Sequence, residues 1–174
     1  MKLKLYFISL LVVGFFFVSC ASVPSSKVTY DIQIEYESEN SPVTLNITPA
    51  WTNSILGSGF RGFECTFTNH SDKSAKVVWD ESSLNYNGNT YVPFLDGQRY
   101  IKAQEPMSPA VIAKGGTISK GVYSSNQPHY TSGQYGGWSM HPIEANEVQL
   151  IFMIKSDSKE EYITATVKSI INKD

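Results

Sequence analysis

The sequence predicts an all-β fold, an antiparallel β-sandwich of about seven to nine strands that follows an N-terminal signal helix. Segments in which apolar and polar residues alternate recur along the chain, and Gly, Pro or Asn residues separate them. Aromatic residues reach 13%, with 10 Tyr and 9 Phe, which favours strands. Helical patterns are sparse, and a length of 174 residues fits one domain.

Residues 1–19 have the composition of a secretory signal. Lys2 and Lys4 give a positively charged start. Residues 5–18 form an apolar stretch of about 14 residues, shorter than the roughly 20 residues of a membrane span. The stretch ends in Phe17-Val18-Ser19-Cys20.

This ending resembles the lipobox of bacterial lipoproteins, in which an aliphatic residue, a small or aliphatic residue and then Gly, Ala or Ser precede an invariant Cys. Val18, Ser19 and Cys20 match the lipobox, whereas Phe17 stands where Leu is usual. The resemblance implies that the mature chain begins at Cys20 and is anchored to a membrane by fatty-acyl chains such as palmitate. The alternative is an ordinary secretory signal that is cut near Ala21.

The lipoprotein resemblance divides the chain into a signal peptide (1–19), a lipidated Cys with its tether (20–27) and a β-sandwich domain (28–174). The tether is small and polar, with one Pro. In many Gram-negative lipoproteins a non-acidic residue at the position of Ala21 goes with transport to the outer membrane. The resemblance therefore implies the outer membrane of the cell envelope.

Charge and cysteine content narrow the function further. The formal net charge of -2 gives no reason to expect nucleic acid as a partner. Only Cys65 would remain as a free thiol after acylation of Cys20, and it shares a strand face with Phe63 and Phe67. We therefore expect Cys65 to be buried and unreactive.

The first half of the domain contains four predicted strands. Residues 28–37 alternate between apolar and polar side chains, and residues 43–48 do so until Pro49, which is expected to end the ladder. Residues 62–68 form a third strand. Residues 75–79 form a fourth strand, which is apolar enough to be central.

The next segments are joined by turns. Asn87-Gly88 lies between the short arms 84–86 and 89–92, and it accepts the two positive φ angles of a type I′ hairpin turn. Pro93 ends the second arm. Residues 111–123 predict another strand–turn–strand around Lys114-Gly115-Gly116.

The C-terminal part contains the most apolar strand. Residues 147–155 predict a central strand that is buried on both faces. Residues 161–171 close the fold, with Ile163, Ala165 and Val167 on one face and Tyr162 on the other. A single helical turn is expected near residues 102–107.

The turn Thr68-Asn69-His70-Ser71-Asp72 and the strand that ends at Trp79-Asp80 resemble a loosely defined group of small bacterial lipoproteins with immunoglobulin-like domains. The resemblance covers residues 68–88 and implies an immunoglobulin-like β-sandwich, with no particular activity. The Cys–Trp–Cys hallmark of immunoglobulin domains is absent, but Trp79 is a candidate for the aromatic residue between the sheets.

The motifs of catalytic and metal sites are weak here. The Gly57-x-Gly59-x-x-Gly62 pattern precedes a strand instead of a helix, so it predicts a loop or bulge and no dinucleotide site. His70, His129 and His141 lack zinc-site spacing and read as surface loop residues. Asp31, Glu35 and Glu37 line the wet face of a strand. We expect no cofactor, no metal and no enzyme activity, with a hydrolase as the least favoured alternative.

Residues 124–142 are the most informative stretch. They form a long, Gly-rich connection in which Tyr130, Tyr135 and Trp138 stand among Ser, Gly and Asn, a composition typical of binding loops. A second long connection, 93–109, carries Phe94, Arg99 and Tyr100 and is expected to lie beside it. The candidate partner-binding residues are Tyr130, Tyr135, Trp138, Tyr100 and Arg99. The alternative is that these aromatic rings fold back and cap an open end of the sandwich.

Together these features predict a lipid-anchored, non-enzymatic interaction module of the cell envelope. Its expected partners are a membrane, through the N-terminal lipid, and an envelope protein or glycan, through the aromatic loops. The alternative is a structural or assembly accessory, in which a sheet edge or face packs permanently on a partner protein.

Overall fold

The computed structural model describes residues 27–39, 41–54, 57–134, 136–157 and 159–172, which form twelve strands and one short 3₁₀ turn. The strands are β1 (Lys27–Tyr36), β2 (Val43–Ser54), β3 (Gly57–Asn69), β4 (Ala75–Tyr86), β5 (Asn89–Tyr91), β6 (Pro93–Leu95), β7 (Ala110–Ile112), β8 (Thr117–Ser124), β9 (Pro128–Thr131), β10 (Gly137–Met140), β11 (Glu147–Ser156) and β12 (Lys159–Asn172). The 3₁₀ turn η1 (Tyr100–Lys102) stands slightly before the helical turn predicted near residues 102–107. The predicted all-β class is confirmed.

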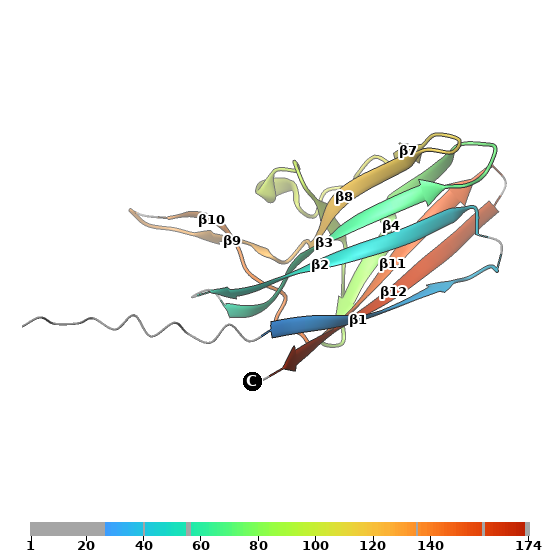
Figure 1. The fold of residues 1–174 in the computed structure, drawn as a ribbon. Helices are drawn as coiled ribbons and strands as arrows, with labels where there is room; N and C mark the ends of the chain where they lie inside the picture. Colours follow the sequence, from blue (N-terminus) through green and yellow to red (C-terminus); the bar gives the residue numbers. More distant parts are fainter. Residues whose placement is uncertain (1–26, 40, 55–56, 135, 158, 173–174) are drawn as a thin grey trace, which may run out of the picture.

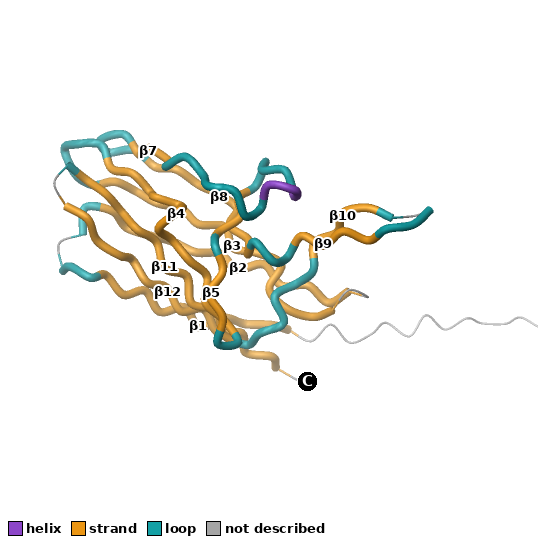
Figure 2. Tube along the Cα trace, turned by 180° about the vertical axis from the view of Figure 1, so that it is seen from behind, coloured by secondary structure: helices purple, strands orange, loops and turns teal. Residues whose placement is uncertain are grey.

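The strands form two antiparallel sheets and a separate hairpin (Figure 1). The first sheet has the order β1-β12-β11-β4-β5, and β7 also pairs with β4. The second sheet has the order β2-β3-β8-β6, and β9 pairs with β10 in the hairpin. The two larger sheets lie face to face as two layers, which we call the two-sheet body (Figures 1 and 2).

The apolar core lies between the two sheets. Phe67 of β3 contacts Trp79 of β4 and Phe152 of β11, with ring centroids 6.0 Å and 5.1 Å apart. All three side chains are almost completely buried. Because these edge-on contacts join one sheet to the other, the prediction that Trp79 lies between the sheets is confirmed.

The alternating segments turn their apolar side chains inward, as predicted. In β12, Ile163, Ala165 and Val167 are buried, whereas Tyr162 is exposed on the other face. The strand β11 lies between β12 and β4, and its adjacent residues Phe152 and Met153 are both buried. Since adjacent residues of a strand face opposite ways, β11 is covered on both faces at this point.

Pro49 does not end its strand, and this prediction was wrong. The strand β2 continues through Pro49 to Ser54, because β2 is an edge strand that leaves alternate N–H groups unpaired. Opposite Ala50 and Trp51, β3 carries Arg61 as an extra residue. The glycine pattern over residues 57–62 therefore lies in a strand that contains a bulge, one of the two forms that the sequence predicts.

The connections around β4 and β8 agree with the sequence predictions only in part. Asn87 and Gly88 have φ angles of 50° and 73°, which confirms the tight hairpin between β4 and β5. The arms predicted at residues 75–79 and 84–86 belong to one strand, β4, with an irregular register opposite β11. The strand–turn–strand over residues 111–123 links the sheets, because β7 pairs with β4 and β8 pairs with β3.

Candidate functional site

Residues 124–142, which the sequence predicts to form a long binding loop, contain an antiparallel hairpin. Its strands β9 and β10 place Tyr130 directly opposite Trp138. Aromatic pairs at opposite positions stabilise antiparallel strands, which accounts for a ladder in a segment so rich in Gly and Ser. The hairpin projects from the end of the two-sheet body at which β1 begins (Figures 1 and 2).

The base of this hairpin is fixed to the body by buried polar contacts. Gln127 is 2% exposed, and its side-chain amide nitrogen donates to the carbonyl oxygens of His141 at 3.0 Å and Arg61 at 3.1 Å. Beyond β10, Phe60 and Ile143 exchange two backbone hydrogen bonds of 3.1 Å and 2.8 Å. The hairpin strands therefore leave the body in a defined direction.

Three aromatic rings meet where the hairpin approaches η1. The ring centroid of Trp138 lies 5.4 Å from that of Tyr130 and 6.0 Å from that of Tyr100. Tyr100 also packs against the buried Phe94, at 5.8 Å. Tyr130, Trp138 and Tyr100 are 58%, 43% and 38% exposed. We call these three residues the aromatic surface.

The predicted site residues thus divide into three groups. Tyr100, Tyr130 and Trp138 lie together, so the two long connections are neighbours, as the sequence predicts. Their exposure favours a contact surface over a cap on the core. Arg99 precedes η1 with an exposed side chain. Tyr135 and Cys20 lie outside the described residues.

A shallow pocket of about 220 Å³ lies beside the aromatic surface. Besides Tyr100, its lining includes Arg61, Asp96, Tyr123 and Met140. Its volume is below the ~300–1,000 Å³ of typical small-molecule sites. Sequence reasoning missed this pocket, because its residues come from β3, β8, β10 and a turn whose proximity depends on the tertiary fold.

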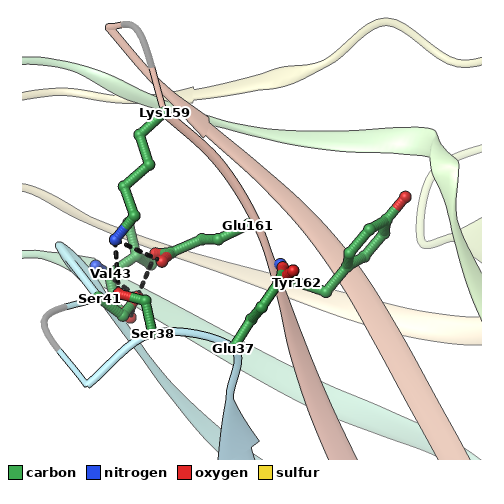
Figure 3. A network of polar contacts seen from close by, with 7 residues as sticks. All are labelled: Glu37, Ser38, Ser41, Val43, Lys159, Glu161 and Tyr162. Atoms are coloured by element: carbon green, nitrogen blue, oxygen red, sulfur yellow. Dashed lines mark hydrogen bonds and ion pairs between the residues drawn. The ribbon is translucent and has the colours of Figure 1, made fainter.

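A second polar cluster, also missed, joins the turn between β1 and β2 to β12 (Figure 3). The carboxylate of Glu161 is 3% exposed, accepts a hydrogen bond from Ser41 Oγ at 2.5 Å and pairs with Lys159 Nζ at 2.9 Å. Lys159 also donates to Ser38 Oγ at 2.5 Å. A hydroxyl beside a carboxylate and an ammonium has parts of a nucleophilic site. Here the ammonium is ion-paired and the hydroxyl is held by the carboxylate, so the cluster fastens the turn to the sheet.

Cys65 is fully buried, as the sequence predicts. Burial, and then the nearby charge of Glu64, raise the pKa of the Cys65 thiol. The group therefore stays protonated and is a poor nucleophile. His129 and His141 lie with ring centroids 5.0 Å apart, but the described residues contain no group of three or more candidate metal ligands.

Comparison of the chain with protein-family models, with curated proteins and with solved structures finds no match. Over the described part of the chain, no helix has the length and apolar character to cross a membrane.

Proposed function

We propose that this chain is a lipid-anchored lipoprotein of the bacterial cell envelope, acting as a non-enzymatic interaction module. The lipid attaches at Cys20, and Ala21 favours the outer membrane. The body is an immunoglobulin-like β-sandwich, a proposal supported by two antiparallel sheets with aromatic side chains packed between them. The aromatic surface contacts a second component of the envelope.

The observation that carries this proposal is the arrangement of Tyr100, Tyr130 and Trp138. The three rings stay partly exposed, yet each has at least one ring neighbour, and the buried ring of Phe94 supports Tyr100. Rings held in this way lose little conformational entropy when a partner covers them. Tyr and Trp also offer both apolar area and a polar atom, which suits binding surfaces.

The non-enzymatic part of the proposal is supported by the state of the reactive groups. The thiol of Cys65 is closed off from solvent, and the carboxylate of Glu161 is held by Ser41 and Lys159. The pocket beside Tyr100 is small and open to solvent. In the described residues, these groups do not converge on a common cavity.

Two measurements test the proposal. The mass of the mature N-terminus, compared with that of a Cys20→Ser variant, reports whether Cys20 carries acyl chains. Envelope extract is then offered to the lipidated protein and to a Tyr130→Ala/Trp138→Ala variant, and the captured material is compared. We expect acylation and a capture that depends on the two rings. Equal capture together with a large loss of folding stability would instead assign the rings to the core.

The outer face of the second sheet favours a second candidate, a structural accessory. On this face Thr66 bonds to Ser119 at 2.7 Å and Thr68 bonds to Thr117 at 3.1 Å, across β3 and β8. This layer of hydroxyl groups, beside the exposed Glu64 on the same face, suits permanent packing on a partner protein. Loss of capture by Thr66→Lys, with capture by Trp138→Ala unchanged, would favour this candidate.

A further inference from the structure

The aromatic hairpin and the start of the domain lie at the same end of the two-sheet body. The strand β1 begins at Lys27, and the β9–β10 hairpin projects from that end (Figures 1 and 2). Contacts between β1 and the hairpin base support this arrangement. The ring centroids of Tyr30 in β1 and Phe60 lie 6.1 Å apart, and Phe60 is hydrogen-bonded to Ile143 just beyond β10.

The proposed anchor limits how far this end can lie from a membrane. Residues 21–27 separate Cys20 from the body of the domain. Even fully extended, at about 3.3–3.6 Å per residue, they span at most about 25 Å. A chain held by lipid at Cys20 therefore keeps the hairpin end close to the bilayer surface.

The hairpin has the chemistry of a bilayer interface. Trp and Tyr are enriched at the level of the lipid headgroups, because their rings are apolar and carry a polar atom. Tyr130 and Trp138 are both exposed on the hairpin. Residues 124–143 contain no Asp, Glu, Lys or Arg, so contact with headgroups would bury no formal charge of this segment.

Both ends of the body carry ion pairs, and at the hairpin end this is the exposed pair Glu147–Lys168, so the uncharged hairpin itself distinguishes the two ends. At the opposite end, where β11 meets β12, the ion pair Lys155–Glu160 is exposed, and Lys73–Asp157 lies nearby. Charged groups of this kind are most stable in water. Tyr162 is exposed near the same end and has about the same exposure as Trp138, 40% against 43%.

We propose that Tyr130 and Trp138 rest in the headgroup region of the phospholipid bilayer that holds the lipid anchor. The hairpin is then a second, non-covalent membrane contact that sets the orientation of the domain. This inference rests on the proposed function, since it requires the lipid at Cys20, and it names the bilayer as the component that the aromatic surface contacts. The exposed Arg99 beside Tyr100 adds attraction to anionic lipids.

The test uses the lipidated protein, purified from membranes and reconstituted in vesicles of phosphatidylethanolamine and phosphatidylglycerol. The vesicles carry lipids brominated near the headgroup end of the acyl chains, which quench Trp fluorescence on contact. Comparison with Trp138→Phe separates the emission of Trp138 from that of Trp51 and the buried Trp79. As a matched control, Tyr162→Trp in the Trp138→Phe background places an indole at the opposite end.

We expect brominated lipid to quench the fluorescence of Trp138, which is the emission absent from Trp138→Phe. The fluorescence of the indole introduced by Tyr162→Trp should remain unquenched. If neither indole is quenched in a chain whose mass shows acylation, the bilayer contact is wrong and the anchored module stands. In that case the aromatic surface binds the protein or glycan whose capture from envelope extract depends on Trp138. Equal quenching of both indoles also overturns the inference, since the domain then has no fixed orientation. A mass without acyl chains removes the proposed function, and the inference with it.

Discussion

The ring of Trp138 lies 6.0 Å from the ring of Tyr100, and this contact joins two connections that are distant in the sequence. Tyr100 belongs to η1, between β6 and β7, whereas Trp138 stands on β10. Tyr100 packs in turn against Phe94, which is 2% exposed. The aromatic surface therefore rests on a buried ring that lies outside the core cluster between the sheets.

The partial exposure of Trp138 predicts that its removal costs little stability. Trp138→Ala is expected to lower the free energy of unfolding by less than about 1 kcal/mol, as for most surface substitutions. Phe67→Ala, in the fully buried core, is expected to cost about 3–5 kcal/mol. Urea denaturation followed by circular dichroism measures both without depending on Trp fluorescence. A cost for Trp138→Ala as large as that for Phe67→Ala would place the ring in the core.

The buried carboxylate of Glu161 predicts a stability role for the cluster in Figure 3. Glu161→Ala removes the acceptor of the Ser41 hydroxyl and the partner of Lys159, so it is expected to cost about 1.5–3 kcal/mol. Glu161→Gln keeps one acceptor oxygen and should cost less. The free energy of unfolding from urea titration gives both values.

An exposed ion pair supplies the control for Glu161. Lys102 Nζ lies 2.7 Å from Glu105 Oε2, and both side chains are about half exposed. Glu105→Ala is therefore expected to change stability by about 0–1 kcal/mol. Equal costs at Glu105 and Glu161 would mean that burial of the Glu161 carboxylate adds nothing to the strength of its contacts.

Much of the body was predictable because a strand with one buried face alternates its residues. The faces of β12 follow from that period, the burial of β11 follows from its continuous apolar run, and Asn87-Gly88 marks its turn by the φ angles that it tolerates. The end of β2 was not predictable, because Pro49 breaks an inner strand but fits an edge strand. Edge position depends on pairing between distant segments, which a local pattern does not contain.

The proximity of the two aromatic connections was predictable from the sequence, but the hairpin that presents Tyr130 and Trp138 was not. The composition of residues 124–142 indicates a contact surface, and Tyr130 and Trp138 are exposed. The hairpin that presents them has four-residue strands, too short for a clear period. In the sequence, Glu161 is one of several charged residues near a predicted turn. Its burial against Ser41 depends on the tertiary fold.

The buried thiol of Cys65 predicts a pH dependence of stability. Burial raises its pKa in the folded state, so above the unfolded pKa of about 8.5 the unfolded chain loses a proton that the folded chain keeps. The stability provided by the neutral thiol is complete below that pH and declines as pH rises, by about 1.4 kcal/mol per pH unit. Urea titrations of the wild type and of Cys65→Ala under reducing conditions, between pH 7 and about 10, measure the effect.

The comparison with Cys65→Ala isolates the thiol, because Tyr and Lys residues titrate alike in both chains. We expect the advantage of the wild type to be constant up to about pH 8 and to shrink above it. A difference that stays constant to pH 10 would mean that the folded chain ionises the thiol as readily as the unfolded chain does, in conflict with its complete burial.

The base of the hairpin packs closely against Gly59, where only a residue without a side chain fits. A Cβ at this position would overlap the carbonyl oxygen of Ile143, whereas nothing lies within 4 Å of a Cβ added at Gly137. Gly59→Ala is therefore expected to displace Ile143 from Phe60 and to cost about 1–3 kcal/mol, and Gly137→Ala should have little effect. Amide hydrogen exchange at Phe60 and Ile143 reports the loss of their two hydrogen bonds. Full protection in Gly59→Ala would show that the base can shift without losing its pairing, and the direction of the hairpin would then need another restraint.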